Sequence, residues 1–181
     1  GDRLVQAKDT LDHTAMLDNL TGALNQNAFV NLARGELERA RRNQSSLSLI
    51  AFHADNFKAI VDQHGRSVGN DVLTLIAQGI REKSRPYDGL GRYEGDTFIL
   101  ILPGVVGAEA ENVAGRILKG IAHTKITLLD DTELKVDLSV GIVSSGRITA
   151  STEIEALMNN TREALALAKR AGDNQIYTIY V

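Results

Sequence analysis

The stretch LGRYEGDTFILIL, residues 90–102, decides how this chain is expected to fold. Two runs rich in apolar residues flank the segment Glu94, Gly95 and Asp96, whose polar and flexible residues suit a tight turn. Two such runs on either side of a turn predict a β-hairpin. Because functional residues often lie on loops that a rigid scaffold holds in place, the tip of this hairpin is a candidate site.

Three further segments have the pattern of strands. Residues 47–52 form a short apolar run typical of a central strand covered on both faces, and the run ends at His53. Residues 134–142 alternate between apolar and polar or small side chains, which predicts a second strand. Residues 175–181 predict a terminal strand. Together with the hairpin, these segments predict a sheet.

Helical spacing of apolar residues accounts for most of the remaining chain. Helices are predicted over residues 26–42, 72–80, 113–121 and 154–168. The second of these helices follows a predicted loop over residues 61–70, with Asn70 as its N-cap. Gly172 is expected to close the last helix.

The order helix, strand, helix, hairpin, helix, strand, helix, strand favours an α/β fold of the α+β kind, with helices on the faces of a central sheet. A thin apolar stripe predicts a connecting helix over residues 1–17. Residues 18–181 are expected to form one domain, because this length suits a single hydrophobic core. The chain begins with Gly1 instead of Met, so we expect it to be a piece of a longer protein.

Composition excludes several classes of protein. The 181 residues include 20 Lys and Arg against 23 Asp and Glu, a formal net charge of −3, which excludes a protein that holds DNA or RNA by bulk positive charge. The absence of Cys excludes a disulfide framework, an iron–sulfur cluster and a thiolate zinc site, and it suits a cytoplasmic protein. No apolar run approaches about 18 residues, so no contact with a membrane is expected.

Five blocks of the sequence carry a resemblance to a known family. They are DNLTGALNQNAF (residues 18–29), HADNFKAIVDQHGRSVGNDVL (53–73), GRYEGDTF (91–98), LSVGI (138–142) and ALAKRAGDN (166–174). In this order they resemble the successive motifs of a GGDEF domain, the diguanylate cyclase family. The resemblance implies a central, mostly antiparallel sheet of about five strands flanked by helices, as in nucleotidyl cyclases. It also implies an activity in which two subunits, each holding one GTP, use bound metal ions to form cyclic di-GMP.

The first strand and the hairpin depart from the family pattern where metal binds. Active members carry a metal-binding Asp where this chain has His53, and imidazole is a poor ligand for Mg²⁺. Glu94 replaces the first glycine of the motif, where its side chain and charge would oppose a triphosphate. Asp96 is kept as a candidate metal ligand, but Thr97 replaces the acidic residue after it. The remnants of the catalytic site are His53, Asp55, Glu94, Gly95, Asp96 and Thr97.

The positions that bind guanine and phosphate in the family are altered as well. Val61 stands where the family has an Asn that bonds the base, and Asn70 stands where it has an Asp. Val61 cannot form this hydrogen bond, and Asn70 can satisfy only part of the donor pair of guanine. Lys58 and Lys169 remain as phosphate-binding candidates, but Asp173 replaces an Arg beside the phosphates. These changes predict weak or absent binding of GTP.

A second nucleotide site is suggested by RPYD, residues 85–88. Arg85 and Asp88, followed by five residues and then Glu94, match the RxxD spacing of the family's inhibitory site, which binds the product cyclic di-GMP. Arg offers paired donors to phosphate or guanine, and Asp accepts from guanine. Arg116 stands where family members often supply another Arg. The alternative is that Asp88 does not indicate a ligand, because the resemblance implies an Asp before this hairpin in many members of the family whatever they bind.

The resemblance leaves several functions open. The leading hypothesis is a degenerate, non-catalytic module of cyclic di-GMP signalling, without a cofactor, that binds this dinucleotide, a partner protein or other domains of its chain. One alternative is an active diguanylate cyclase that uses Mg²⁺ with Asp55, Asp96 and Lys169, and another is a non-catalytic domain that binds GTP. A transition-metal site at His53, Asp55 and Asp96 is a further alternative. A homodimer is also compatible with the resemblance.

Overall fold

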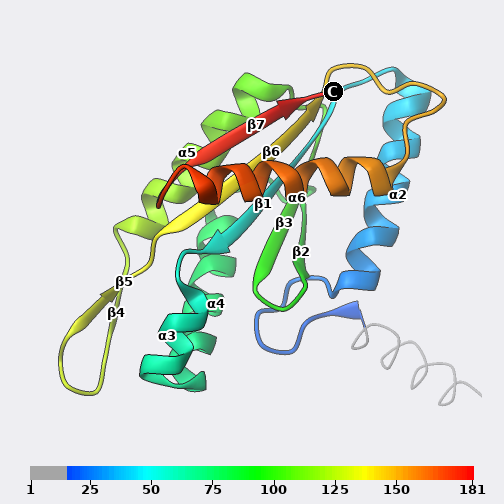
Figure 1. Cartoon of the computed structure of the whole chain (residues 1–181). Helices are drawn as coiled ribbons and strands as arrows, with labels where there is room; N and C mark the ends of the chain where they lie inside the picture. The colour runs from blue at the N-terminus through cyan, green and yellow to red at the C-terminus, as the bar shows by residue number, and fades with distance from the viewer. Residues whose placement is uncertain (1–15) are drawn as a thin grey trace, which may run out of the picture.

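The structure, a computed structural model, describes residues 16–181 and has a five-stranded sheet at its centre (Figure 1). The strands lie in the order β2-β3-β1-β6-β7, and all neighbours are antiparallel except β6 and β7. The strands are β1 Leu47–Ala54, β2 Gly89–Tyr93, β3 Thr97–Pro103, β6 Leu138–Ser145 and β7 Ile176–Tyr180. The expected mostly antiparallel sheet is confirmed, whereas the connecting helix predicted over residues 1–17 falls almost entirely outside the described residues.

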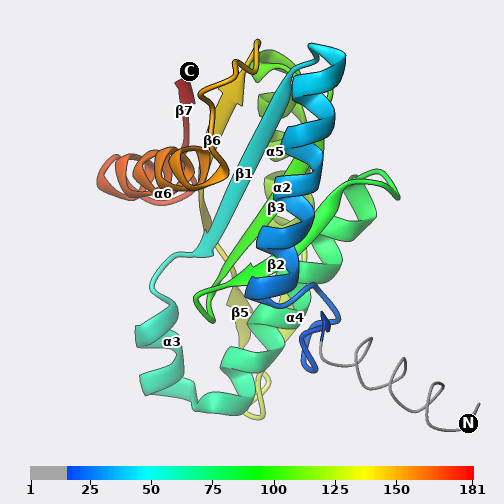
Figure 2. The same cartoon turned by 90° about the vertical axis from the view of Figure 1, so that its right-hand side faces the viewer.

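Helices cover both faces of this sheet. The remaining elements are α2 Gln26–Asn43, α3 Phe57–His64, α4 Arg66–Lys83, α5 Gly107–Ala122, α6 Ile154–Arg170, and the small sheet of β4 Lys125–Thr127 and β5 Glu133–Lys135. Helices α2 and α6 pack on one face, and α4 and α5 on the other (Figures 1 and 2). No helix within residues 16–181 has an apolar stretch long enough to cross a membrane.

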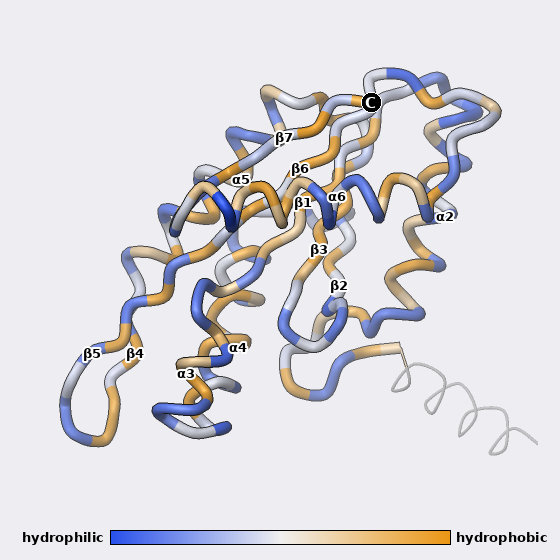
Figure 3. The backbone as a smooth tube through the Cα atoms, in the orientation of Figure 1, coloured by the Kyte–Doolittle hydropathy of each residue, from blue (hydrophilic) through white to orange (hydrophobic). Residues whose placement is uncertain are grey.

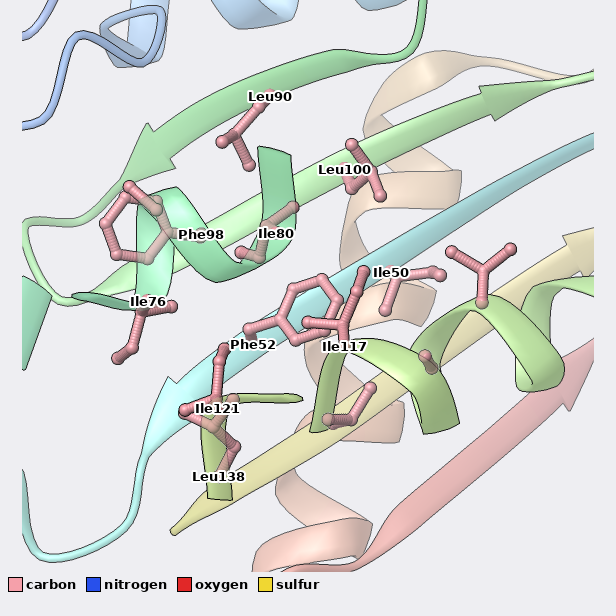
Figure 4. Close-up of a cluster of buried hydrophobic side chains, with 14 of the residues drawn as sticks. Ile50, Phe52, Ile76, Ile80, Leu90, Phe98, Leu100, Ile117, Ile121 and Leu138 are labelled. Atoms are coloured by element: carbon pink, nitrogen blue, oxygen red, sulfur yellow. The ribbon is translucent and has the colours of Figure 1, made fainter. Parts of the chain in front are cut away.

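The middle strands are buried on both faces, as their apolar sequence predicts. Successive side chains of a strand point to opposite faces of the sheet. Ile50 and Phe52 therefore join the core cluster beneath α4 and α5, while Leu49 and Ala51 join the cluster beneath α2 and α6. Figure 4 shows Phe52 beside Ile117 of α5 in the first of these clusters. Two separate cores thus hold β1, and with it His53, in a fixed position.

Helix α6 crosses β6 at Gly141, where a side chain would not fit. A Cβ atom on Gly141 would lie 2.2 Å from the backbone nitrogen of Leu165. Such a separation is far inside the distance at which non-bonded atoms attract each other. The glycine of the block LSVGI therefore allows α6 to approach the sheet closely.

The loop predicted over residues 61–70 is wrong, because this segment is helical. Helices α3 and α4 meet at Gly65, whose φ of +92° permits the sharp bend between them. Asn70 consequently lies inside α4 and is not its N-cap. Helix α3 has 8 residues, too few for helical periodicity to be distinguished from a loop.

The single strand predicted over residues 134–142 is also wrong, because the chain divides there into β5 and β6. At the break, the backbone oxygen of Asp137 accepts a hydrogen bond of 2.8 Å from the N–H of Asp55. The side chain of Asp137 accepts another of 2.8 Å from Asn174 Nδ2. These bonds to distant loops interrupt the strand, and the alternation of side chains cannot reveal them.

Candidate functional site

The turn between β2 and β3 is hydrophilic and lies near the end of β1 (Figures 1 and 3). Glu94 and Gly95 both have left-handed backbone conformations, with φ of +55° and +85°. Positive φ at consecutive residues matches the right-handed twist of hairpin strands. Glycine adopts this conformation freely, whereas a residue with a Cβ is destabilised there by about 1 kcal/mol. The motif position occupied by Glu94 therefore has a backbone that favours glycine.

His53 and Asp96 bond to each other beside this turn. The register of β1 and β3 places His53 opposite Thr97, which brings the imidazole to the hairpin. His53 Nε2 lies 2.9 Å from Asp96 Oδ2. The other ring nitrogen, Nδ1, is buried and has no hydrogen-bond partner among the described residues. The Asp96 carboxylate is thus engaged by an imidazole, and the buried Thr97 next to it carries no charge.

An ion pair fastens the hairpin tip to α6. Glu94 Oε1 accepts a hydrogen bond of 2.7 Å from Arg162 Nη2, and the two side chains are 49% and 45% exposed. The Arg162 guanidinium also lies 5.6 Å from the centroid of the Tyr93 ring, within reach of a cation–π interaction. The backbone N–H of Glu94 donates to Gln26 Oε1 at 3.3 Å. These contacts hold an acidic side chain at the tip.

A second ion pair braces the base of the hairpin against the loop before α2. Arg92 Nε donates to the backbone oxygen of Gly95 at 2.6 Å, and Arg92 Nη1 donates to Asp18 Oδ1 at 3.0 Å. Asp18 also accepts hydrogen bonds from the backbone N–H and the hydroxyl of Thr21. Partial burial alone would raise the pKa of Asp18, but the bonds from Thr21 and Arg92 outweigh burial and lower this pKa.

Asp55 is engaged by other loops and not by the hairpin. Its Oδ1 accepts from Ser139 Oγ at 2.5 Å, and its Oδ2 accepts from the backbone N–H of Asn174 at 3.1 Å. Within residues 16–181, no group of three or more His, Asp or Glu side chains is arranged to share a metal ion. Mg²⁺ needs several oxygen ligands in near-octahedral geometry. The donor set of Asp96, paired with His53, and Asp55, bonded elsewhere, does not fit such an ion or a transition metal.

The positions implied for guanine lie at the junction of α3 and α4. Val61 of α3 packs against Gly69 of α4, where a Cβ atom would lie 2.7 Å from Val61 Cγ2. Asn70, the next residue, is half-buried. Val61 therefore serves the packing of the two helices and offers no hydrogen bond to a base.

The residues implied for phosphate are all exposed. Lys58 lies on α3, Lys169 lies in the last turn of α6, and Asp173 lies in the loop that follows α6. Neither lysine side chain makes a hydrogen bond or ion pair within residues 16–181. The structure therefore does not link these positions to the hairpin tip by any direct contact.

The segment before β2 holds Arg85 against Asp88. The backbone N–H of Arg85 donates to Asp88 Oδ2 at 2.8 Å, and Arg85 Nη2 donates to Asp88 Oδ1 at 3.1 Å and to the backbone oxygen of Pro103 at 3.2 Å. The guanidinium lies 4.5 Å from the centroid of the Tyr87 ring. The Asp88 side chain is 1% exposed, whereas that of Arg85 is 39% exposed. The hydrogen bonds that Arg85 donates to Asp88 outweigh burial and raise the pKa of Arg85.

A groove of about 660 Å³ runs beside Arg85, a volume typical of sites for small ligands. The groove is lined by Arg81 and Arg85, by the exposed ring of Tyr87 and by the apolar side chain of Leu90. Arg116 is exposed on α5, does not line this groove and makes no contact with Arg85 in the described part of the chain. The groove therefore joins the RPYD segment to α4.

Three residues of these sites were not singled out from the sequence. Arg162 follows Glu94 by 68 positions, and nothing in the local sequence connects the two. Tyr87 lies between Arg85 and Asp88, so the RPYD segment itself was the available signal. Arg92 stands in the block GRYEGDTF, but its bonds to Asp18 and Gly95 become evident only when the fold brings the two segments together.

The comparisons with known proteins bear directly on this arrangement. A model of the family described as "Diguanylate cyclase, GGDEF domain" matches residues 15–175. The chain belongs to the GGDEF family. It is thus a domain of the cyclic di-GMP signalling family, and at the motif that names the family this GGDEF domain has EGDTF, residues 94–98.

Individual relatives agree with this assignment. The diguanylate cyclase DosC of Escherichia coli (strain K12) is 29% identical over 164 residues, which cover 91% of this GGDEF domain and 35% of DosC. The chain therefore spans about a third of the length of that relative. The diguanylate cyclase SiaD of Pseudomonas aeruginosa, solved in complex with its activator SiaC, matches with a TM-score of 0.87 and 28% identity over 98% of this chain and 67% of SiaD.

A third match concerns the fold alone. The GGDEF domain of DgcB from Caulobacter crescentus, solved in complex with cyclic di-GMP, has a TM-score of 0.84 at 22% identity, covering 91% of this chain and 93% of that one. Together with SiaD, it confirms the expected sheet flanked by helices as a GGDEF fold.

Proposed function

We propose that this GGDEF domain is a non-catalytic signalling module that binds cyclic di-GMP through Arg85. The hydrogen bond between His53 and Asp96 carries the proposal, because it occupies the hairpin carboxylate that a catalytic metal ion would need. The domain then acts through the dinucleotide and through contacts with a partner protein or with other domains of its chain.

Several features of the hairpin support the absence of turnover. Metal-assisted phosphoryl transfer depends on charges that are already in place where negative charge develops. Glu94 adds a carboxylate at the tip, where Arg162 fixes it. Thr97 is buried and uncharged, and Asp55 is bonded to Ser139. Each of these features weakens the binding of a metal–triphosphate complex.

The geometry around Arg85 supports dinucleotide binding. Asp88 holds one edge of the guanidinium, and Arg85 Nη1 makes no hydrogen bond with the described residues. An oriented guanidinium with free N–H groups is suited to phosphate or to the acceptor edge of guanine. The exposed Tyr87 ring and the groove of about 660 Å³ provide a flat apolar surface beside it. Arg116 lies on α5 outside this groove and is not part of the proposed site, and the fold shared with DgcB, captured with cyclic di-GMP, gives support by analogy.

Calorimetric titration with cyclic di-GMP, and separately with GTP, both with Mg²⁺, tests the proposal. We expect saturable binding of cyclic di-GMP and none of GTP. Arg85→Ala should weaken the binding of the dinucleotide about tenfold or more, because a hydrogen bond to a charged group contributes about 1.5–3 kcal/mol. Asp96→Ala is the matched control in the other region and should leave the affinity unchanged.

Three outcomes would contradict the proposal in different ways. Binding of GTP without turnover would favour a GTP-dependent regulator. Formation of cyclic di-GMP from GTP would show an active cyclase that uses Asp55, Asp96 and Lys169. Dinucleotide binding that survives Arg85→Ala but is lost with Asp96→Ala would place the ligand at the hairpin.

A further inference from the structure

The two edges of the central sheet differ in whether another segment of the chain bonds to them. At the β2 edge, the N–H of Leu24 donates to the backbone oxygen of Leu90, and the N–H of Arg92 donates to the backbone oxygen of Leu24, both at 2.9 Å. The loop before α2 thus occupies hydrogen-bonding groups of that edge. At the opposite edge, β7 is the outermost strand, and no strand of residues 16–181 lies beyond it (Figure 1).

The hydrogen bonds between β6 and β7 show which backbone groups of β7 face outward. The N–H of Val140 donates to the backbone oxygen of Gln175, and the N–H of Val181 donates to that of Ser144. Residues of β7 with odd numbers therefore bond to β6. Because backbone groups alternate in direction along a strand, the N–H and C=O groups of Ile176, Thr178 and Tyr180 point to the free edge.

The side chains of β7 itself carry no charge that would prevent another strand from pairing. Natural edge strands are protected by Lys, Pro, bulges or a covering segment. Residues 175–181, QIYTIYV, contain no charged residue and no Pro. Tyr177, Tyr180 and Val181 are 43%, 66% and 54% exposed, respectively. A hollow of about 370 Å³ lies beside the strand, lined by Glu111, Ile176, Tyr177, Thr178 and Tyr180.

We propose that β7 pairs with β7 of a second copy of this chain, antiparallel and about a two-fold axis at Thr178. In this register Thr178 lies opposite the partner's Thr178, and Ile176 lies opposite the partner's Tyr180. All three outward-facing residues then exchange hydrogen bonds with outward-facing residues of the other copy. Moving the axis by one residue in either direction leaves one of the three without a partner.

A second copy fits this edge because the edge is complementary to itself. An interface with two-fold symmetry requires that the same surface match its own rotated image, which the neutral sequence around Thr178 allows. Pairing also places the exposed Tyr177 opposite the partner's Ile179 and the exposed Tyr180 opposite the partner's Ile176, which removes apolar surface from water. Glu111 accepts a hydrogen bond of 2.8 Å from Thr178 Oγ1. The Glu111 carboxylates of both copies therefore flank the axis, so added salt should tighten the dimer by screening their repulsion.

The absence of Cys from the sequence allows a direct test of the register. Residues that exchange hydrogen bonds across antiparallel strands have Cα atoms about 5.5 Å apart, within the range of about 4.4–6.8 Å that a disulfide spans. Thr178→Cys should therefore form a covalent dimer on mild oxidation. Ile176→Cys alone and Tyr180→Cys alone should not, but an equal mixture of the two should form a mixed disulfide. Cross-linking of Thr178→Cys no faster than Ile176→Cys would overturn the proposal.

Sedimentation velocity of the unmodified chain tests the same interface without a cross-link. We expect the average mass to rise with protein concentration and to rise further with salt. Thr178→Pro removes an outward N–H without removing a bond to β6, and it should weaken the dimer about tenfold or more. Thr178→Val keeps the N–H and should dimerise like the unmodified chain, and Ile176→Pro is a second variant if Thr178→Pro fails to fold. A chain that stays monomeric, or a Thr178→Pro variant that dimerises normally, would refute the interface.

Discussion

Two regions of this GGDEF domain use arginine, carboxylate and an aromatic ring in different ways. The hairpin end comprises His53, residues 94–97 and Arg162, and the Arg85 loop comprises residues 84–88. In the hairpin end, Glu94 and Arg162 are 49% and 45% exposed, so neither side of the pair is fixed by burial. In the Arg85 loop, Asp88 is 1% exposed and holds an arginine that is 39% exposed. The first pair is thus exposed on both sides, whereas in the second a buried carboxylate orients an arginine that reaches solvent.

The difference shows that the same chemical groups can close a site or prepare one. At the hairpin, the His53–Asp96 bond engages the carboxylate that a metal ion would otherwise bind, and the Arg162–Glu94 ion pair holds the added carboxylate at the tip. In the Arg85 loop, the Asp88 carboxylate accepts hydrogen bonds from one edge of the Arg85 guanidinium and so orients it. The remaining N–H groups of the guanidinium are then held in a fixed direction. Whether a charged residue is available to a ligand therefore depends on which member of its pair is buried.

The largest expected effect concerns turnover of GTP. We predict that the purified domain with Mg²⁺ and GTP forms no detectable cyclic di-GMP, measured by chromatography. Thr97→Glu alone should not restore activity, because His53 still bonds to the Asp96 carboxylate and Glu94 still lies at the tip. Product that is abolished by Asp96→Ala, or a clear rescue by Thr97→Glu, would show that the hairpin end is not closed.

The next effect concerns the buried carboxylate of the Arg85 loop. Asp88→Ala leaves the N–H of Arg85 and one edge of its guanidinium without their partner, and it should lower the free energy of unfolding by about 2–3 kcal/mol. It should also weaken the binding of cyclic di-GMP about tenfold, as we expect for Arg85→Ala. Asp88→Asn keeps one acceptor and should give smaller losses, measured by denaturant unfolding and calorimetry. A stable Asp88→Ala variant with unchanged affinity would remove the proposed role of Asp88.

The predictable part of the fold is the part that short-range signals determine. The apolar run of β1 and the turn at Glu94 are local, and both elements lie where the sequence predicts. The division between β5 and β6 depends instead on the bonds that Asp55 and Asn174 make to Asp137, residues far apart in the sequence. Such bonds exist only after the sheet has formed, so no pattern along the chain encodes them.

The candidate site also has a part that the sequence predicts and a part that depends on contacts between distant residues. Resemblance to the family could name His53 and Asp96 as positions of interest, but their mutual bond arises from the register of β1 and β3. The sequence also places Asp55 near them, two residues after His53, whereas in the structure Asp55 accepts a hydrogen bond from Ser139 on β6. Sequence reasoning thus located the regions, and only the fold shows which side chains meet.

A smaller effect distinguishes the contribution of the backbone conformation of Glu94 to stability from that of its ion pair with Arg162. Glu94→Ala removes the ion pair with Arg162 and keeps a Cβ at φ +55°, whereas Glu94→Gly removes the pair and also relieves the left-handed conformation. We expect Glu94→Gly to be about 1 kcal/mol more stable than Glu94→Ala. Arg162→Ala should change the stability by only about 0.2–1 kcal/mol, because the pair is exposed. Equal stabilities of the Gly and Ala variants in thermal unfolding would show that the turn carries no strain.

The smallest effect is a pH dependence at the base of the hairpin. Bonds from Thr21 and Arg92 lower the pKa of Asp18 in the folded chain, so its ionised form is favoured by folding. The resulting stability is present above the unfolded pKa of about 3.9 and is lost as the pH falls through the lower, folded pKa. Asp18→Asn should therefore flatten the fall in unfolding free energy on acidification, by about 1 kcal/mol or less. Arg92→Gln should flatten it in part, because the bonds from Thr21 remain, and an acid unfolding curve unaltered by Asp18→Asn would rule out this linkage.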